Sequence, residues 1–458
     1  MRKIALLLIL AVLPAYASVL RVGPAEKYMV PSEAASKVSN GDTVEITAGD
    51  YIGDGAIWTK NDLLIRGVGG KAHLIAGSKI PQDKAIWIVQ GQNTTIENIE
   101  FSDARVPDKN GAGIRMEGTH LTVRHCYFHD NEDGILAGDN ANSDILIEFC
   151  EFAYMGFGDG FSHNLYINHV RSLTFRFNYS HHAKSGHTLK TRALNNYIMY
   201  NFLTDSSDGN SSYLLDMPNG GKSLVIGNVF YESQASDNYT SVTFGTEGFN
   251  NPEAKLYFIN NTLVSGRTKC GFVNVRDGAT DVRFVNNIFC GTTAITYAQT
   301  IAKWISKNNL FTEEPDLLKF QDISKFNYHI TAGSSAIGAG IQPPVVDGFD
   351  TAPTGEYLHP HDSVNYISQG TFDIGAYHFP IPADVRESAP DQVIANINGT
   401  ITLPENAIEY EIFDIMGNMI LQSKEQRIIN ILEFAEGIYF IRVKTEKGIM
   451  NYKLIQIK

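Results

Sequence analysis

The sequence is poor in cysteine: four residues are too few to hold a chain of 458 residues together by disulfide bonds. Beyond its N-terminus it also lacks any run of the about 18 uncharged apolar residues that a transmembrane helix needs. Basic residues are scarce, with 37 Lys and Arg against 50 Asp and Glu and a formal net charge of -13. This acidic balance argues against a nucleic-acid binder or a protein of anionic membrane surfaces.

The N-terminus has the form of a secretory signal peptide. A charged start, Met1–Lys3, precedes an apolar run from Ile4 to Leu13 and a small-x-small cleavage site at Ala15–Ala17. The apolar run is too short to span a bilayer. We expect residues 1–17 to be removed and the mature protein to be exported as a soluble monomer.

A short pattern recurs through much of the chain: alternating apolar positions, often an Asn, then an aromatic or aliphatic residue. The frames are IENIEF, VRHCYF, IEFCEF, FRFNYS, IMYNFL, VIGNVF, FINNTL and FVNNIF. Their fourth positions, 23 to 33 residues apart, are Ile99, Cys126, Cys150, Asn178, Asn201, Asn228, Asn261 and Asn287. This period is typical of a solenoid in which each coil buries its apolar face against the next.

The repeat predicts a parallel β-helix. Successive coils stack at the spacing of parallel strands, about 4.8 Å, so equal positions of neighbouring coils touch. The Asn residues then form an internal column in which side-chain amides hydrogen-bond from coil to coil. Cys126 and Cys150 fall in the same column as buried thiols, and a disulfide between them is not required.

Residues 18–380 resemble the right-handed parallel β-helices of the pectin-lyase-like superfamily. The segment from Arg21 to Gly53 is similar to the start of such proteins, where an amphipathic helix, here after Ser32, covers the open end of the first coil. SSAIGAG and FDIGAY are similar to the ends of exported bacterial β-helices. The resemblance implies an all-β fold, a single-stranded right-handed parallel β-helix with an N-terminal cap.

After a polar linker, residues 381–392, the coil period stops and short alternating strands follow. Residues 393–458 resemble the C-terminal sorting domain of the type IX secretion system, through FDIMG, GIYFIRV and the last six residues, although the Asn-Pro pair that commonly opens such domains is absent. The resemblance implies a small C-terminal β-sandwich, recognised by the type IX secretion machinery, and export to the cell surface or medium. An ordinary β-sandwich accessory module is the alternative.

One stretch departs from the acidic character of the chain. From Gly160 to Thr204 there is no Asp or Glu, but there are five Lys or Arg and five of the 13 His. We expect these cations, without ion-pair partners in their own stretch, to be open to an external anion. A long groove along stacked strands suits an extended polymer, so the predicted partner is an acidic polysaccharide.

The coil register places these residues on one face. If Leu165, Leu189 and Leu215 point inward, side-chain alternation puts their successors together on the outer face. We call this outer set and its neighbours the basic ridge. Its strand residues are Arg115, Tyr166, Lys190 and Asp216, with Asn168 and Arg192 two residues further along the same face; its corner residues are His163 and His187, and its turn residues are His169 and Lys184.

Such a ridge suits β-elimination in a uronate polymer. The reaction needs a cation at the C5 carboxylate, a base for the C5 proton and an acid for the leaving O4. Lys190, His187 and Tyr166 are the predicted acid and base residues, and Arg192 and Arg115 the predicted carboxylate partners. The expected activity is that of a secreted polysaccharide lyase.

Residues 167–200 also resemble the active region of β-helix alginate and dermatan-type lyases, which carry a Lys in one coil and an Arg in a TLRHG-like strand of the next. Thr188–Arg192 takes the place of that strand, but Lys190 stands where the Arg would be. Asn168 and His169 stand where the Lys would be. The resemblance implies a lyase and leaves the identity of its base open.

Other functions remain open. A glycoside hydrolase would need two facing carboxylates, for which Asp133, Asp159 and Asp216 are candidates, although the paired-Asp and Gly-His-Gly motifs of β-helix polygalacturonases are absent. A uronate epimerase shares the proton-abstraction step. A non-catalytic surface binder would use the ridge for docking only, with Lys190 held by Asp216 in a structural salt bridge.

Calcium is the cofactor that the sequence favours, since a zinc site from His181, His182 and His187 lacks a convincing ligand geometry. Asp130, Glu132, Asp133 and Asp139 lie within ten residues near the predicted groove, and clustered oxygens suit Ca²⁺. Several β-helix lyases use calcium to hold the uronate. The spacing is not that of a recognised calcium loop, so no metal is required by the sequence.

Overall fold

The computed structural model describes residues 17–297, 300–365 and 371–379, together with the strands between 392 and 456. The chain divides into two units, Met1–Phe379 and Pro380–Lys458. The predicted signal peptide, except its last residue, and the predicted linker, except Gln392, lie outside the described residues.

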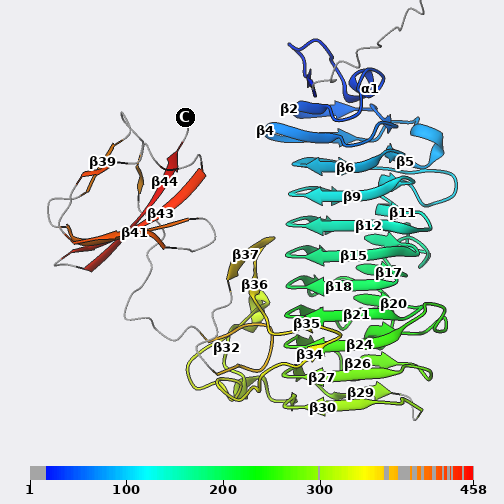
Figure 1. The fold of residues 1–458 in the computed structure, drawn as a ribbon. Coiled ribbons are helices and arrows are strands. Elements are labelled where there is room, and N and C mark those ends of the chain that lie inside the picture. Colours follow the sequence, from blue (N-terminus) through cyan, green and yellow to red (C-terminus); the bar gives the residue numbers. More distant parts are fainter. Residues whose placement is uncertain are drawn as a thin grey trace, which may run out of the picture. The chain divides into compact units, whose positions relative to one another are not determined.

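The first unit is a parallel β-helix in which every coil contributes strands to the same faces (Figure 1). One face is a ten-stranded sheet, here called the ridge face. Its strands are β3 (Ala56–Trp58), β5 (Ala85–Val89), β8 (Ala112–Met116), β11 (Asp133–Ala137), β14 (Leu165–Ile167), β17 (Leu189–Thr191), β20 (Leu215–Met217), β23 (Thr240–Phe244), β26 (Cys270–Val275) and β29 (Thr293–Tyr297).

A 21-stranded sheet forms two further faces, and β2 and β4 bend across both. The long face contains β1 (Val19–Val22), β2 (Thr43–Ile52), β4 (Leu64–Ile75), β6 (Gln92–Glu97), β9 (Thr119–Arg124), β12 (Asn140–Glu148), β15 (Val170–Arg176), β18 (Asn195–Met199), β21 (Gly221–Ile226), β24 (Ala254–Ile259), β27 (Asp281–Val285) and β30 (Trp304–Lys307). The short face contains β7 (Ile99–Ser102), β10 (Tyr127–His129), β13 (Glu151–Ala153), β16 (Tyr179–His181), β19 (Phe202–Thr204), β22 (Val229–Glu232), β25 (Thr262–Ser265), β28 (Ile288–Cys290) and β31 (Leu310–Thr312).

The predicted Asn column lies in the turns between the long and short faces. Asn178 Nδ2 donates to Asn201 Oδ1 at 3.1 Å, and the same bond repeats from coil to coil as far as Asn309. Towards the N-terminus the column continues in thiols, since the backbone N–H of Cys150 donates to Asn178 Oδ1 and that of Cys126 to Cys150 Sγ. All four cysteines are free and buried, so the expected buried thiol stack is confirmed.

A second column, on the outer side of the long face, alternates in charge over seven coils. It consists of Arg21, Glu45, Arg66, Glu97, Arg124, Glu148 and Arg176. Arg66 pairs with Glu45 at 2.6 Å, and Arg176 with Glu148 at 2.6 Å. Each charge in this charge column therefore finds an opposite charge on a neighbouring coil.

A five-residue helix, α1 (Pro31–Ala35), lies at the position predicted for the cap and contacts β1 and β3. It is about one turn long: Pro31 opens it, and the backbone N–H of Ser36, which follows its last residue, donates to the carbonyl of Ser32. Pro31 and Ala34 are its buried residues. A short helix is therefore present at the position predicted for the cap.

After β31 the chain turns back along the β-helix and packs against the short face. It forms η2 (Pro315–Leu317), β32 (Phe320–Asp322), η3 (Ile323–Lys325), β33 (Asn327–Ile330), β34 (Val345–Val346), β35 (Phe349–Asp350), β36 (Gly355–Leu358) and β37 (Asp362–Asn365). Leu318, Tyr328 and Tyr357 bury themselves with Phe202 and Ile288 of the coils. Most of this segment covers the short face over β19 to β28, whereas Val346 of β34 packs on Leu224 and Tyr257 of the long face.

The second unit has a five-stranded and a two-stranded sheet. The first contains β38 (Gln392–Ile394), β44 (Gly448–Gln456), β43 (Gly437–Thr445), β40 (Ala407–Asp414) and β41 (Met419–Ser423); the second contains β39 (Thr400–Thr402) and β42 (Ile428–Asn430). Ile401 and Ile429 of the small sheet share one core with Ile412 and Ile441 of the large one. The predicted C-terminal β-sandwich is confirmed. In neither unit do the described residues include a helix long and apolar enough to cross a membrane.

Candidate functional site

The basic ridge lies on the ridge face, with the strand register that the sequence predicts. Leu189 pairs with Leu215, and both are buried. Tyr166 faces Lys190, which in turn faces Asp216 one coil further on. Leu136 and Arg115 extend the same column towards the N-terminus. The structure therefore brings the predicted strand residues together, and their roles stay predictions.

The cations of the ridge are not free of ion-pair partners, so this expectation was wrong. Lys190 Nζ lies 3.1 Å from Glu247 and 3.5 Å from Asp216, and Arg192 Nη2 lies 2.7 Å from Glu247. The side chains of Lys190 and Arg192 are only 13% and 14% exposed. The carboxylates that pair with Lys190 and Arg192 come from later coils and turns, outside the stretch from Gly160 to Thr204.

The turn residues of the ridge are paired in the same way. Lys184 Nζ is 3.9 Å from Asp130, and His169 Nδ1 is 3.6 Å from Asp139. Asn168 accepts the N–H of His169 through its own side chain. Lys184 and His169 thus lie beside carboxylates of neighbouring turns, whereas Asn168 bonds to the residue that follows it.

His163 and His187 form a stacked pair at the corner before β14 and β17. Both are buried, and their ring centroids are 4.5 Å apart. His163 Nδ1 accepts the backbone N–H of His187 at 3.1 Å, and His187 Nδ1 accepts that of Tyr213 at 3.3 Å. An accepting Nδ1 carries no proton, so each neutral ring holds its proton on Nε2.

Burial lowers the pKa of His163 to about 3 and also lowers that of His187, and the nearby charge of Lys190 acts in the same direction. Both rings are therefore neutral at physiological pH. His187 Nε2 lies 3.4 Å from Asp216. With Nδ1 occupied and Nε2 protonated, His187 has no nitrogen free to take a proton from a substrate, which leaves Lys190 and Tyr166 as the better placed acid and base candidates.

Tyr166 and Arg192 form the outer part of the ridge. Arg192 Nε donates to Tyr166 Oη at 2.9 Å, and Arg192 Nη1 donates to Asn219 Oδ1. The guanidinium is thus fixed by a phenol, an amide and the carboxylate of Glu247. Burial lowers the pKa of Arg192, but the interactions with Glu247 and Tyr166 outweigh it and raise the pKa above its usual value. Arg115, two coils away, lies beside Glu117 at 3.8 Å.

The hydrolase candidates do not face one another across an open space. Asp133 is buried and accepts the backbone N–H of His163 at 2.8 Å, and burial raises its pKa to about 8. Asp216 is buried as well, accepts from Thr243 Oγ1 at 2.5 Å, and has its pKa raised by burial. Asp159 lies in a turn 4.0 Å from Lys109.

The acidic residues considered for calcium point in different directions. Glu132 is buried and accepts the N–H groups of Val106 and Gly111. Asp130 lies beside His129, whereas Asp139 is exposed at the opposite side of β11. Within the described part of the chain these residues form no three-ligand group, while His73, Glu100 and His129 on the short face do. A calcium role for the acidic residues therefore stays a prediction.

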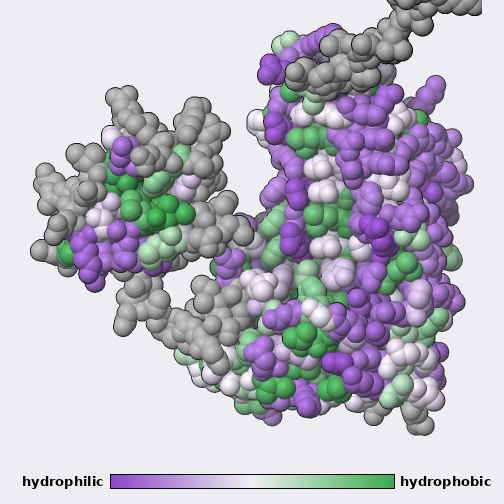
Figure 2. All heavy atoms as spheres, in the orientation of Figure 1, coloured by the Kyte–Doolittle hydropathy of each residue, from purple (hydrophilic) through white to green (hydrophobic). Residues whose placement is uncertain are grey.

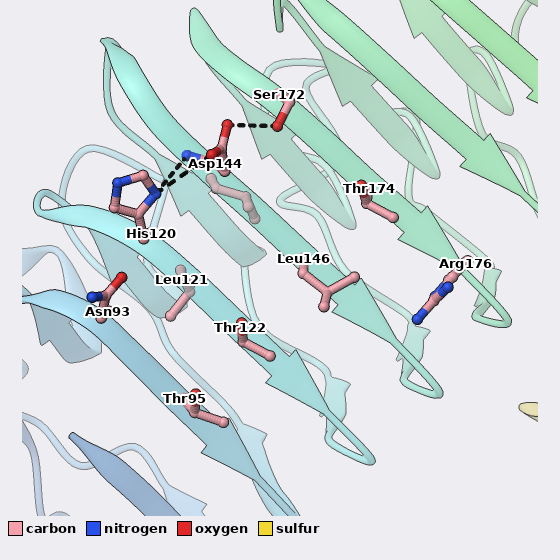
Figure 3. A pocket seen from close by; sticks show the side chains of 11 residues that line it. Asn93, Thr95, His120, Leu121, Thr122, Asp144, Leu146, Ser172, Thr174 and Arg176 are labelled. Atoms are coloured by element: carbon pink, nitrogen blue, oxygen red, sulfur yellow. Dashed lines mark hydrogen bonds and ion pairs between the residues drawn. The ribbon is translucent and has the colours of Figure 1, made fainter. Parts of the chain in front are cut away.

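A groove of about 590 Å³ lies elsewhere, on the outer side of the long face (Figure 3). Its floor is the column Thr95, Thr122, Leu146 and Thr174, and its ends are His120 and Arg176. Hydrophilic side chains dominate this face (Figure 2). No residue of the basic ridge lines the groove, whose ionisable lining residues are His120, Asp144 and Arg176.

Sequence reasoning missed Glu247 and Asn219 in the ridge and the three residues of the short-face group. Glu247 lies 57 residues after Lys190 in a turn, where coil periodicity carries no signal. The pairing of His73 with Glu100 could have been found from the sequence. Aligning HLI, residues 73–75, with EFS, residues 100–102 of the next coil, pairs these two residues, as in the structure.

Comparison with known proteins agrees with this architecture. Residues 63–230 match the family model described as right handed beta helix region, and residues 390–458 match that of the secretion system C-terminal sorting domain. The chain is thus a right-handed parallel β-helix protein with a C-terminal type IX sorting domain. That domain supports secretion or export to the cell surface.

Among solved structures, the pectate lyase Pel9A is similar at a TM-score of 0.54 and 14% identity, over 79% of this chain and 96% of that chain. A variant of the PL6 family alginate lyase AlyGC matches at a TM-score of 0.34 and 13% identity, over 85% of this chain and 62% of that chain. No curated protein matches the sequence. At such identities the likeness to Pel9A establishes the fold alone.

Proposed function

We propose that this protein is an exported polysaccharide lyase that cleaves a uronate-containing polymer by β-elimination at the basic ridge. The observation that carries the proposal is the carboxylate of Glu247, which Lys190 and Arg192 hold together at 3.1 and 2.7 Å. Two cations converging on one carboxylate mark where a uronate carboxylate would bind. Glu247 is 46% exposed, so a substrate can displace it.

The bound carboxylate would lie beside the two acid and base candidates. Arg192 also holds Tyr166 Oη at 2.9 Å, so charge stabilisation and the phenol are positioned by one guanidinium. Lys190 holds the carboxylate as a cation, so it can only give a proton, and deprotonated Tyr166 takes the C5 proton. The electron pair of the C5–H bond forms the C4–C5 double bond, the C4–O4 bond breaks, and O4 leaves with its electron pair and takes a proton from Lys190.

Asp216 and the stacked pair His163 and His187 support this arrangement from the buried side of Lys190. Asp216 is buried under Lys190, contacts His187 Nε2 and accepts from Thr243. It therefore anchors Lys190 while Glu247 is replaced by substrate. The neutral state of both histidines adds no positive charge that would repel Lys190.

The test is ultraviolet absorbance of the purified protein on alginate, pectate and glycosaminoglycans, with added Ca²⁺ and with a chelator. Elimination creates a conjugated unsaturated uronate that hydrolysis does not. We expect Arg192→Ala and Lys190→Ala to lower the rate about 100-fold or more. Lys222→Ala is the matched control, since Lys222 lies on β21 of the long face.

A non-catalytic polysaccharide binder is the second candidate, favoured by the complete pairing of Lys190 with Asp216 and Glu247. Binding of a polymer without any product would support it. Reducing ends without ultraviolet absorbance would point to a hydrolase instead, and exchange of the C5 proton without cleavage to an epimerase.

A further inference from the structure

The short face carries a group of side chains that the proposed lyase chemistry does not use. His73 on β4 pairs in register with Glu100 on β7, and His129 on β10 pairs with Ser102, two residues beyond Glu100. The three side chains belong to consecutive coils. We infer that His73, Glu100 and His129 form a binding site for a divalent transition-metal ion, of which Zn²⁺ is the type best suited.

The ligand atoms are close to the spacing that a metal requires. Glu100 Oε1 lies 3.0 Å from His129 Nε2 and 3.6 Å from His73 Nε2, and all three atoms lie within 4.8 Å of one another. Ligand bonds of about 2.0–2.1 Å in a tetrahedron separate ligand atoms by roughly 3.3 Å. A side-chain rotation that brings the two imidazole nitrogens closer completes the geometry.

The other nitrogen of each ring is already oriented by a carboxylate. His73 Nδ1 lies 3.3 Å from Asp50, and His129 Nδ1 lies 3.0 Å from Asp130. Histidines that bind metals commonly donate the second ring N–H to a carboxylate, which fixes the tautomer and directs the Nε2 lone pair to the ion. Two such carboxylates around one group are a stronger indication than the three ligands alone.

The surroundings suit a doubly charged ion. The side chains of His73, Glu100 and His129 are 21%, 23% and 19% exposed, so an ion can reach them while the rings stay supported. Tyr127 stacks on His129 with ring centroids 4.5 Å apart. Without an ion, His73 Nε2 contacts Ser102 Oγ at 2.9 Å, a bond that the metal would replace.

The ligand set also indicates the kind of metal. Two imidazoles and one carboxylate suit Zn²⁺ and its first-row neighbours, whereas Ca²⁺ and Mg²⁺ prefer oxygen ligands. The protein supplies three ligands, which leaves a fourth position for water or an external group. The site is on a different face from the basic ridge, so its occupancy and the lyase activity can be tested separately.

The experiment is titration of the full chain, freed of metal by a chelator, with Zn²⁺ and separately with Co²⁺. We expect one ion per chain in calorimetry, a rise in the melting temperature, and Co²⁺ absorption bands typical of four-coordination. His129→Ala and the milder His73→Gln should each weaken Zn²⁺ binding at least tenfold. His120→Ala should not, since His120 has a single neighbouring carboxylate, Asp144, on the long face.

The melting temperature of each metal-free variant shows whether it folds. If His129→Ala does not fold, His73→Gln still tests the inference. Equal Zn²⁺ binding by wild type and both variants would overturn the inference, as would the absence of any one-to-one binding. Lyase activity does not enter this readout, so failure of the proposed function would leave it intact.

Discussion

Two pairs of histidines on the same β-helix differ in almost every physical respect. His163 and His187 are buried, stacked and bonded at Nδ1 to backbone N–H groups, and the pKa of both is lowered. His73 and His129 are partly exposed and bonded at both nitrogens to side chains, and bonds to Glu100 and Asp130 raise the pKa of His129 against the effect of burial. The first pair belongs to the interior framework of the coils, whereas the second has partners that a ligand can replace.

The largest expected effect is on stability. His163→Ala removes the acceptor of a buried N–H and leaves a cavity, so we expect the free energy of unfolding to fall by about 2–4 kcal/mol. His73→Ala, on the surface, should change it by less than about 1 kcal/mol in the absence of metal. Urea unfolding followed by tryptophan fluorescence measures both. Equal losses would contradict the distinction between the pairs.

The pH dependence of unfolding tests the buried pair alone. The pKa of His163 is about 3 in the folded state against 6.5 when free, so it contributes stability above pH 6.5 that is lost as the pH falls towards 3. The change in the free energy of unfolding is roughly 1.4 kcal/mol for each unit by which the pKa values of the folded and unfolded states differ. Asp133, with a pKa raised to about 8, acts in the opposite direction as the pH rises. In His163→Phe the loss of stability at acid pH should be smaller than in wild type.

Chemical labelling compares the two pairs directly. Diethyl pyrocarbonate modifies accessible imidazoles, and peptide mass spectrometry locates the product. We expect labelling of His73 and His129 at least tenfold faster than that of His163 and His187. Zn²⁺ should protect the first two only. Rapid labelling of His187 in the folded protein would show that its ring is more accessible than its 8% side-chain exposure implies.

The smallest effect on stability is expected at Glu247, the replaceable partner on the ridge. Glu247→Gln removes an exposed ion pair and should change the free energy of unfolding by less than about 1 kcal/mol. It should nevertheless tighten binding of uronate polymers, since Lys190 and Arg192 lose their internal competitor. Polymer affinity by calorimetry checks this, and a weaker affinity would indicate that Glu247 itself contacts the ligand.

The sequence predicts the parts of this molecule that repeat. Periodicity located the Asn column and the inward Leu189 and Leu215, and from these the alternation of a strand placed Lys190 beside Asp216. It could not place Glu247, because the turn that carries it follows no coil period and brings together residues far apart in the chain.

The position of His73 was missed for a related reason. β2 and β4 bend across two faces, and their register shifts between Thr47 and Gly49. His73 therefore lies outside the short frame that repeats from Ile96 onward. Two other features likewise depend on tertiary packing: the length of α1 and the return of the chain over the short face. Neither helix propensity nor the coil period contains this information.

The charge column of the long face limits how this β-helix can grow. A solenoid lengthens when coils are duplicated, and from Arg21 to Arg176 the sign of the charge alternates with every coil. Insertion of one coil there sets two like charges about 4.8 Å apart, which is unfavourable. Insertion of two coils keeps the alternation. Within this part of the molecule, the β-helix can therefore gain or lose coils in pairs without losing the pairing of opposite charges.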